Sequence, residues 1–255
     1  MAKKIVIATR LHLGNASSAP SESKLQDILK NFERLGDLVE DFIPVIAVDA
    51  TPKIEKYDYV QAIRSLLPKK SKIEILPVTP WGKFVPALNA LVLYATRIEE
   101  ADKIMFVSAE VRVSIKTIET LCQHLDNDEN VIVAGAAMNG HLYAGKDMRV
   151  ELNGRTTPWN TMAIWNLKKL SLTGFVPCSD LGFSAGVEEC AAIAILQKLF
   201  PSSVAKLVQL DDVAWNETFE DEERRKWHEQ KMKSKVERPK QQLEKLQLSG
   251  TVFHC

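Results

Sequence analysis

The sequence predicts an α/β domain in which a mostly parallel sheet is covered by helices on both faces. Short apolar runs alternate with amphipathic stretches four times between residues 4 and 135. The runs are almost continuously apolar, which is typical of parallel strands buried on both faces. A length of 255 residues with 45% hydrophobic residues suits one large domain, or one domain with an appendage.

The first part of the chain carries the clearest elements. Apolar runs predict strands at residues 4–9, 43–48, 73–78, 103–107 and 131–135. Helical spacing predicts helices between them, at residues 22–35, 57–67, 84–99 and 114–125. Ser21 and Ser114 stand where N-caps are expected, and Pro68 ends the second helix.

The pattern changes after Gly140. Residues 141–151 alternate as a hairpin does, and residues 153–165 are rich in turn formers. An apolar helix is predicted at 187–200 and a last strand at 206–210. Residues 217–248 are highly charged and predict a solvent-facing helical tail, broken near Pro239. We therefore expect one α/β domain at residues 1–216 and a charged helical C-terminal appendage at residues 217–255.

Composition excludes several classes of protein. The 33 Lys+Arg balance the 33 Asp+Glu, so no basic excess points to nucleic acid as a partner. The sequence contains no run of about 18 apolar residues, so no membrane span is expected. The first ten residues lack the long apolar stretch of a signal peptide, so none is expected. The four cysteines form no C-x-x-C pair, which predicts reduced thiols and a cytoplasmic protein without a zinc site.

The common nucleotide and hydrolase motifs are absent. The loop after the first strand has no G-x-G-x-x-G, and no phosphate-binding G-x-x-x-x-G-K-[ST], G-x-S-x-G or H-E-x-x-H occurs. In parallel sheets, ligands bind beyond the carboxyl ends of the strands. The candidate residues at these ends are Thr9 and Arg10, Asp49, residues 79–83, and residues 108–110.

Each acidic candidate has two interpretations. Glu110 can hold a hard divalent cation, or it can pair with a neighbouring arginine or cap a helix. Glu188 and Glu189 open an apolar helix, where acids favour the helix dipole, but a catalytic base can occupy the same place. Asp49 can accept hydrogen bonds from a ribose or a base, or it can start a turn before Pro52.

Two tryptophans lie in the turn-rich segment. Trp159 and Trp165 can stack on a sugar, and burial in the core is an equally common role for tryptophan. Both interpretations stay open at the level of sequence.

Taken together, these segments resemble the GT-A glycosyltransferases, in particular the large family-two inverting group. Residues 102–136 look like the family's metal-site region, with Ser108-Ala109-Glu110 in the place of its aspartate-x-aspartate motif. Residues 46–49 resemble the strand whose acid contacts the nucleotide, and residues 81–90 resemble the helix that packs beside the donor. Gly174-Phe175 followed by Glu188-Glu189 resembles the family's glycine-glycine-phenylalanine and glutamate-aspartate pattern. The resemblance covers about residues 3 to 215, and the order of the motifs carries it.

The resemblance implies a GT-A-like, Rossmann-like fold, in which residues 1–216 form the nucleotide-sugar-binding domain, and an enzyme of the hexosyltransferase type. Its donor would be a nucleotide-diphosphate sugar, its acceptor a hydroxyl, and its mechanism inverting. Charge develops on the leaving diphosphate and must be neutralised, and a hydroxyl needs a base before it attacks. The implied roles are nucleotide-sugar binding by Thr9, Arg10, Asp49, Lys83, Asn89, Ser108 and Ala109, Mn²⁺ or Mg²⁺ binding by Glu110, base catalysis by Glu189 with Glu188 beside it, and acceptor binding by Trp159 and Trp165.

One departure from the family pattern leaves three possibilities open. Ser108 replaces the first aspartate of the metal motif and supplies no anionic ligand. Glu110 can hold the ion alone with water and phosphate, or cations such as Lys83, Arg10 and Arg112 can replace the ion. Activity can also have been lost.

Two further hypotheses belong to other classes. A catalytically inactive GT-A-like binding or scaffold protein would act through residues 217–255, which could also dock on a second copy of the chain as a homo-oligomer. A sugar nucleotidyltransferase would need a glycine-rich loop after the first strand, and residues 10–21 contain only Gly14.

Overall fold

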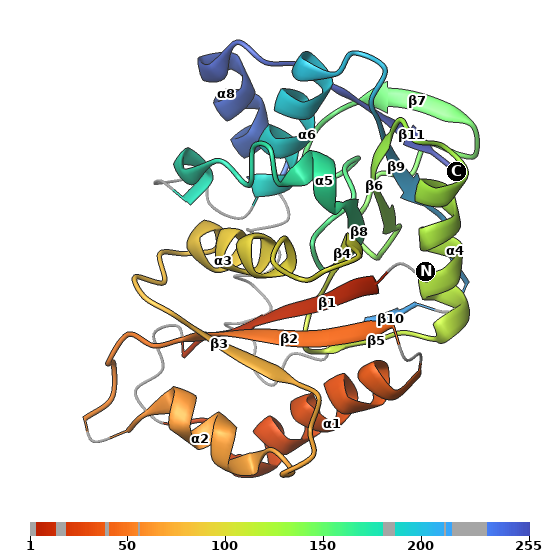
Figure 1. The fold of residues 1–255 in the computed structure, drawn as a ribbon. Helices are drawn as coiled ribbons and strands as arrows, with labels where there is room; N and C mark the ends of the chain where they lie inside the picture. The colour runs from red at the N-terminus through yellow and green to blue at the C-terminus, as the bar shows by residue number, and fades with distance from the viewer. Residues whose placement is uncertain are drawn as a thin grey trace.

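The computed structural model describes residues 4–13, 19–38, 41–55, 57–180, 187–211, 213–215 and 234–255. A twisted sheet runs through the protein, with helices on both of its faces (Figure 1). Its strands are β1 (Lys4–Leu11), β2 (Phe42–Asp49), β3 (Glu74–Val78), β4 (Ala101–Val107), β6 (Val131–Ala136), β7 (Met148–Glu151), β8 (Met162–Asn166), β9 (Val204–Val208) and β11 (Thr251–His254).

These nine strands follow the order β3-β2-β1-β4-β8-β6-β9-β11-β7. Neighbours from β3 to β4 are parallel, as are β6 with β9 and β9 with β11. Two strands run antiparallel to their neighbours, β8 between β4 and β6, and β7 at the edge beside β11. The expected mostly parallel α/β sheet is confirmed. A separate two-stranded ribbon joins β5 (Val111–Arg112) to β10 (Ala214–Trp215).

The helices divide between the two faces of the sheet. They are α1 (Glu22–Leu38), α2 (Tyr59–Leu66), α3 (Val85–Ala95), α4 (Ile115–Asp126), α5 (Leu167–Leu170), the 3-10 helix η1 (Pro177–Asp180), α6 (Glu188–Leu199) and α8 (Glu237–Leu246). Apolar residues of α1, α2 and α4 join one core cluster, and those of α3, α5, α6 and α8 join the other. None of the described helices is both long and apolar enough to cross a membrane.

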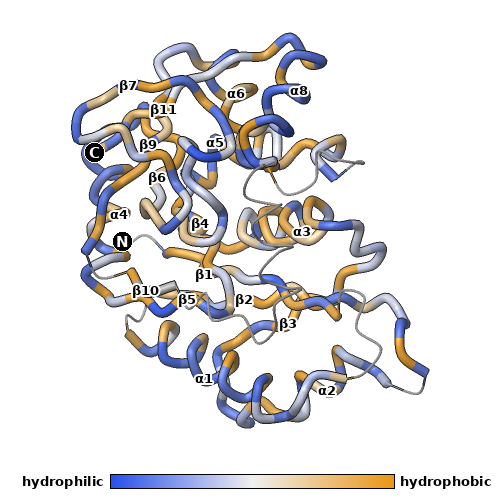
Figure 2. The backbone as a smooth tube through the Cα atoms, turned by 180° about the vertical axis from the view of Figure 1, so that it is seen from behind, coloured by the Kyte–Doolittle hydropathy of each residue, from blue (hydrophilic) through white to orange (hydrophobic). Residues whose placement is uncertain are grey.

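Strand β1 shows how both clusters form on one sheet. Ile5 and Ile7 belong to the first cluster, while Val6 and Ala8 belong to the second. Successive side chains of a strand point to opposite faces, so a continuous apolar run fills both cores. The hydrophobic colour of the central strands in Figure 2 reflects this requirement.

The second half of the sheet differs from the expectation in two places. The predicted hairpin at 141–151 is wrong, because only β7 forms there and its partner is β11. Strand β8 lies inside the segment that was expected to be turn-rich. The first four of its five residues are apolar, but turn-forming residues come directly before them, so the sequence pattern does not reveal the strand.

The described C-terminal residues also differ from a wholly helical, solvent-facing tail. Thr251–His254 forms β11 between β9 and β7 in the main sheet, so it supplies hydrogen bonds to both neighbours. Pro239 does not break α8, because it lies in the first turn of the helix. Backbone N–H groups in a first turn have no partner within the helix, so proline loses no helical hydrogen bond there. Leu243 of α8 is buried in the second core cluster. Residues 216–233 lie outside the described residues.

A long-range cap fixes the start of α3. The Asp180 carboxylate, at the end of η1, accepts hydrogen bonds from the backbone N–H groups of Lys83, Phe84 and Val85 at 2.8, 2.8 and 2.9 Å. Phe84 itself provides no side-chain cap. The first amides of a helix lack internal partners and favour a negative charge. The cap therefore ties the loop after β3 to the segment that precedes α6.

We expect Asp180→Ala to lower the free energy of unfolding by about 2 kcal/mol, since three helix-terminal N–H groups lose their acceptor. Asp58→Ala is the matched control, because Asp58 caps α2 through one bond, to the N–H of Gln61 at 2.9 Å. Its cost should be about half as large. Urea unfolding of both variants measures the difference, and equal losses would contradict the capping role of Asp180.

Candidate functional site

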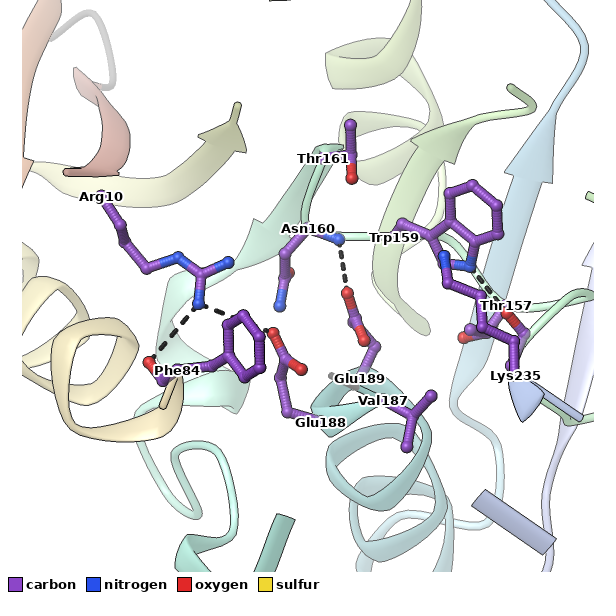
Figure 3. Close-up of a pocket in the computed structure, with 11 residues that line it drawn as sticks. Arg10, Phe84, Thr157, Trp159, Asn160, Thr161, Val187, Glu188, Glu189 and Lys235 are labelled. Atoms are coloured by element: carbon purple, nitrogen blue, oxygen red, sulfur yellow. Dashed lines mark hydrogen bonds and ion pairs between the residues drawn. The ribbon is translucent and has the colours of Figure 1, made fainter. Parts of the chain in front are cut away.

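A polar cavity of about 80 Å³ lies between the carboxyl end of β1 and the start of α6. Its lining side chains come from segments far apart in the sequence (Figure 3). They are Arg10, Phe84, Gly154, Thr157, Trp159, Asn160, Thr161, Val187, Glu188, Glu189 and Lys235. The cavity therefore joins the edge where ligands are expected in a parallel sheet to the predicted acidic pair.

The acidic pair opens α6. Glu188 and Glu189 are its first two residues, and both side chains are buried. An Oε1 atom of Glu189 accepts a hydrogen bond from the backbone N–H of Asn160 at 2.7 Å. Glu188 lies 3.8 Å from the Arg10 guanidinium, measured from Oε1 to Nη1. The N-terminal end of the helix dipole favours negative charge at this position.

Burial, and after it the charge of neighbouring Glu188, raise the pKa of Glu189 to about 7. The N–H of Asn160 and the positive charge of Lys235 act in the opposite direction. A carboxyl group with a pKa near 7 can both take up and release a proton at neutral pH, which is the property of an effective general base.

The positively charged guanidinium of Arg10 lies at the carboxyl end of β1. Its Nη1 donates to the carbonyl oxygen of Phe84 at 3.4 Å, and its guanidinium lies 5.2 Å from the centre of the Phe84 ring. The predicted residue Thr9 precedes it in the strand and is buried. The sequence prediction thus placed Arg10 and the acidic pair in one site, and the structure brings these three together.

Asn160 is a site residue that sequence reasoning missed. The indole N–H of Trp165 donates to Asn160 Oδ1 at 2.9 Å, and an indole nitrogen can only donate, so this bond fixes the orientation of the amide. The Nδ2 atom then has no hydrogen-bond partner among the described residues, although it is buried. In Figure 3 this atom points into the cavity, between Arg10 and Glu188.

The two tryptophans do not offer open faces to a sugar. Trp165 is 0% exposed and packs edge-on against Phe175 in the core. Trp159 is stacked on His141 with ring centres 3.7 Å apart, and Lys235 Nζ lies 3.0 Å from its centre. A ring and an ammonium group cannot share one face at these distances, so both faces of Trp159 are covered. The expectation of acceptor stacking is corrected for both residues, because burial occupies their rings.

Lys235 was also missed, because a lysine in a charged stretch is normally solvated. It is 8% exposed, it lines the cavity, and its backbone packs against Gly154. A Cβ atom built on Gly154 would overlap the Lys235 carbonyl group. A glycine is therefore required at this position for the C-terminal segment to reach the cavity.

Asp49 takes the turn interpretation in the structure. Its carboxylate pairs with Lys53 Nζ at 2.6 Å and accepts the N–H of Thr51 at 3.0 Å. Burial alone would raise the pKa of Asp49, but the bonds to Lys53 and Thr51 outweigh it and lower the pKa. Asp49 lies at the end of β2 and is not among the residues that line the cavity.

Asn89 and Lys83 lie on either side of the start of α3. Both amide atoms of Asn89 bind the backbone of Phe175, Nδ2 to its oxygen at 2.8 Å and Oδ1 to its N–H at 2.7 Å. Asn89 thus holds the Gly174-Phe175 turn, where Gly174 has a φ of 59°. Lys83 is exposed, and its backbone N–H belongs to the Asp180 cap. Neither residue lines the cavity.

The turn predicted to bind a metal ion, residues 108–111, is compact and is hydrogen-bonded to Thr161, which lines the cavity. The Ser108 N–H donates to the Thr161 carbonyl at 2.9 Å, and the Val111 N–H closes the turn on the Ser108 carbonyl at 3.0 Å. Glu110 is exposed, and Ala109 has no ligating side chain. Across the described ranges, no group of three His, Cys, Asp or Glu side chains could hold a metal ion. The described residues of this turn therefore do not fit a divalent ion bound by several protein ligands.

Three solved structures share the fold at low sequence identity. The mannosyltransferase PcManGT from Pyrobaculum calidifontis, solved with GDP-Man and Mn²⁺, has a TM-score of 0.54 and 12% identity, covering 77% of this chain and 52% of that chain. Glucosyl-3-phosphoglycerate synthase from Mycobacterium tuberculosis was solved with phosphoglyceric acid. It has a TM-score of 0.51 and 12% identity, and the match covers 85% of this chain and 73% of that chain. A 4-diphosphocytidyl-2C-methyl-D-erythritol synthase has a TM-score of 0.50 and 14% identity, and the match covers 89% of this chain and 97% of that chain.

This chain spans about half of the length of the mannosyltransferase chain. No protein-family model and no curated protein matches the sequence. The shared feature is thus the architecture, a mostly parallel sheet with helices on both faces. The chain has a GT-A-like fold.

Proposed function

We propose that the protein is a glycosyltransferase that moves a sugar from a nucleotide-diphosphate donor to a hydroxyl acceptor with inversion. The observation that carries this proposal is the buried pair Glu188–Glu189, which lines one cavity with Arg10 at the carboxyl edge of the sheet. The neighbours support it, since the mannosyltransferase was solved with GDP-Man and the synthase also with UDP-glucose.

The donor side of the site is the end of β1 and the turn after β4. In the proposal, the diphosphate lies beside Arg10, with the nucleotide toward Ser108 and Ala109. Negative charge develops on the leaving diphosphate as the bond to the sugar breaks, and the Arg10 guanidinium stabilises that charge. The ion pair of Arg10 with Glu188 is long, at 3.8 Å, so the guanidinium keeps donors that a phosphate can use.

The acceptor side is the start of α6. Glu189 takes the proton of the acceptor hydroxyl, whose oxygen then attacks the anomeric carbon as the diphosphate leaves from the opposite face. A single displacement of this kind inverts the configuration at that carbon. Glu188 contributes through its charge, which raises the pKa of Glu189 and makes it a stronger base once ionised.

Manganese accompanies two of the neighbouring structures. The described residues of this chain offer one exposed carboxylate, Glu110, at the corresponding turn, which does not fit a protein-held divalent ion. No step of the proposed mechanism is therefore assigned to a metal.

We expect Glu189→Gln to reduce sugar transfer by about 10²- to 10⁴-fold, because the amide cannot accept the hydroxyl proton. Its oxygen can still accept the N–H of Asn160, so the fold should be retained. The assay follows release of nucleoside diphosphate from UDP- and GDP-sugars. Glu119→Gln, at an exposed position of α4, is the control and should match the wild type.

Two results would contradict the proposal. If no nucleotide sugar binds at millimolar concentration, the transferase assignment is wrong, and an inactive binding protein becomes the better account. If Glu189→Gln transfers sugar as fast as the Glu119→Gln control, Glu189 is not the base.

The raised pKa of Glu189 also predicts a pH dependence of stability. The folded state binds this proton up to a pKa of about 7, against a usual value of 4.5. Stability from this group is therefore lost as the pH rises from about 4.5 to 7, by on the order of 3 kcal/mol. We expect the melting temperature of Glu189→Gln to rise relative to the wild type between pH 5 and pH 8. A constant difference would contradict the raised pKa.

We expect the removal of manganese to weaken the binding of nucleotide sugars less than the loss of the Arg10 side chain does. We expect Arg10→Ala to weaken binding of nucleotide sugars about tenfold, the effect of one lost charge-assisted contact. Replacing manganese with EDTA should have a smaller effect, because the described turn supplies a single carboxylate. Calorimetry of wild type, Arg10→Ala and the exposed control Arg97→Ala measures both effects. Binding abolished by EDTA but unchanged in Arg10→Ala would reverse this order.

A further inference from the structure

A second cavity, of about 340 Å³, lies where β9, β11 and β7 are side by side in the sheet (Figure 1). Ser203, directly before β9, and Thr251, the first residue of β11, both line it. These are the amino ends of two strands that run in the same direction as β1. Arg10 stands at a carboxyl end, so the second cavity opens at the opposite edge of the sheet.

Helix α6 connects the two cavities without merging them. Glu188 and Glu189 begin the helix and line the first cavity, while Gln197, in its last turn, lines the second. At 1.5 Å per residue, Glu189 and Gln197 are about 12 Å apart along the helix axis. The two cavities share no lining residue. The second cavity is therefore a separate site, which the proposed transfer does not use.

The Gln197 side chain holds the walls of the second cavity in place. Its Oε1 accepts the Thr251 N–H at 2.9 Å, and its Nε2 donates to the carbonyl oxygens of Thr251 at 2.9 Å and Ser203 at 3.3 Å. A Cβ atom on Gly250 would meet Gln197 Oε1 and Leu152 Cδ2, each at 2.7 Å. Glycine thus permits this close approach, and the protein's own bonds fix the walls.

Ser203 brings a hydroxyl group that the protein itself does not satisfy. Its side chain is buried, at 6% exposure, and its Oγ has no hydrogen-bond partner among the described residues. A buried hydroxyl without a partner costs free energy, so such a group at a cavity wall indicates a ligand that accepts a hydrogen bond. Ser202 and Ser249 are exposed and add two more hydroxyl groups to the lining.

Arg149 supplies a positive charge to the same lining. It is exposed, and it forms no ion pair with any residue that the structure describes. It stands directly opposite Phe253 in the antiparallel pair of β7 and β11, so the guanidinium and the ring share one face of the sheet. No Asp or Glu is among the described residues that line the cavity. The carbonyl end of α6 is partly negative, and Lys198 in its last turn offsets that charge.

The donors around the cavity suit a phosphate group better than a carboxylate. A guanidinium presents a fork of N–H groups that binds two oxygens of either anion. A phosphate has a further oxygen, which can accept the hydroxyl hydrogen of Ser203. A volume of about 340 Å³ lies at the lower end of the range of small-molecule sites, so it has room for an organic group beside the Phe253 ring.

We propose that the second cavity binds a small phosphate monoester. Arg149 pairs with two oxygens of the phosphate group, Ser203 donates to a third, and the organic part lies beside Phe253. This inference does not rest on the proposed function, because no residue of the first cavity takes part in it.

Four ligands test the chemistry: glucose 6-phosphate as a monoester, inorganic phosphate, gluconate with a carboxylate, and neutral glucose. Calorimetry of the full chain in a phosphate-free buffer should show glucose 6-phosphate binding at least about tenfold more tightly than gluconate or glucose. It should also bind more tightly than inorganic phosphate, which has no organic part. No binding of glucose 6-phosphate at millimolar concentration, or equally tight binding of any of the other three, would overturn the proposal.

Two variants assign the binding to this cavity. Arg149→Met removes the charge at an exposed position, and it should weaken the binding of glucose 6-phosphate by at least about tenfold. Arg97→Met, at another exposed position, is the matched control and should bind as the wild type does. Ser203→Ala should weaken binding about three- to tenfold. Its melting temperature without ligand should not fall, because the lost hydroxyl has no partner in the folded protein. Unchanged binding in Arg149→Met would overturn the assignment.

Arg10→Ala separates the two cavities. It should bind glucose 6-phosphate as the wild type does, because Arg10 lines only the first cavity. Binding that is lost in Arg10→Ala and kept in Arg149→Met would place the ligand in the first cavity and contradict this inference. A protein that binds glucose 6-phosphate through Arg149 but never binds a nucleotide sugar contradicts the proposed function and supports the phosphate site.

Discussion

Two adjacent carboxyl groups begin α6 inside the protein, and the site is arranged around the cost of burying them. Like charges in a poorly solvated place repel, so at least one carboxyl holds its proton to higher pH. The helix N-terminus, the N–H of Asn160 and the cations Arg10 and Lys235 offset part of that cost. The same arrangement gives Glu189 a pKa of about 7, the range in which a base is most useful at neutral pH.

This constraint explains why distant segments meet at one place. Asn160 precedes β8, the antiparallel strand between β4 and β6, so its backbone N–H reaches the acids only because β8 is inserted there. Lys235 arrives from the other end of the chain and packs on Trp159, beside Gly154. The Asp180 cap ties the loop that carries Phe84 to the residues before α6, and Phe84 in turn holds Arg10.

The sequence was sufficient for the parallel half of the fold. Strands such as β2 and β4 are continuous apolar runs, and Ser114 caps α4 through the N–H of Thr117 as its position predicts. Strand β8 and strand β11 were not predictable in the same way. Each is short, β8 borders on turn formers, and β11 follows a charged segment, so only their partners in the sheet make them strands.

The candidate site was predictable in part, for the same physical reason. Arg10 and the acidic pair stand at ends of elements, where topology gathers residues. Lys235 and Asn160 could not be found, because their burial comes from long-range contacts with Trp159 and Trp165. Asp49 and the tryptophans each had two interpretations in the sequence, and contacts with Lys53, His141 and Phe175 decide for the structural ones.

A crystal structure with an unhydrolysed nucleotide-diphosphate sugar tests the central claim most directly. The account predicts a phosphate beside Arg10 and an anomeric carbon that faces Glu188 and Glu189 across the cavity. A nucleotide sugar bound elsewhere, with the acidic pair out of reach of its anomeric carbon, would contradict the account.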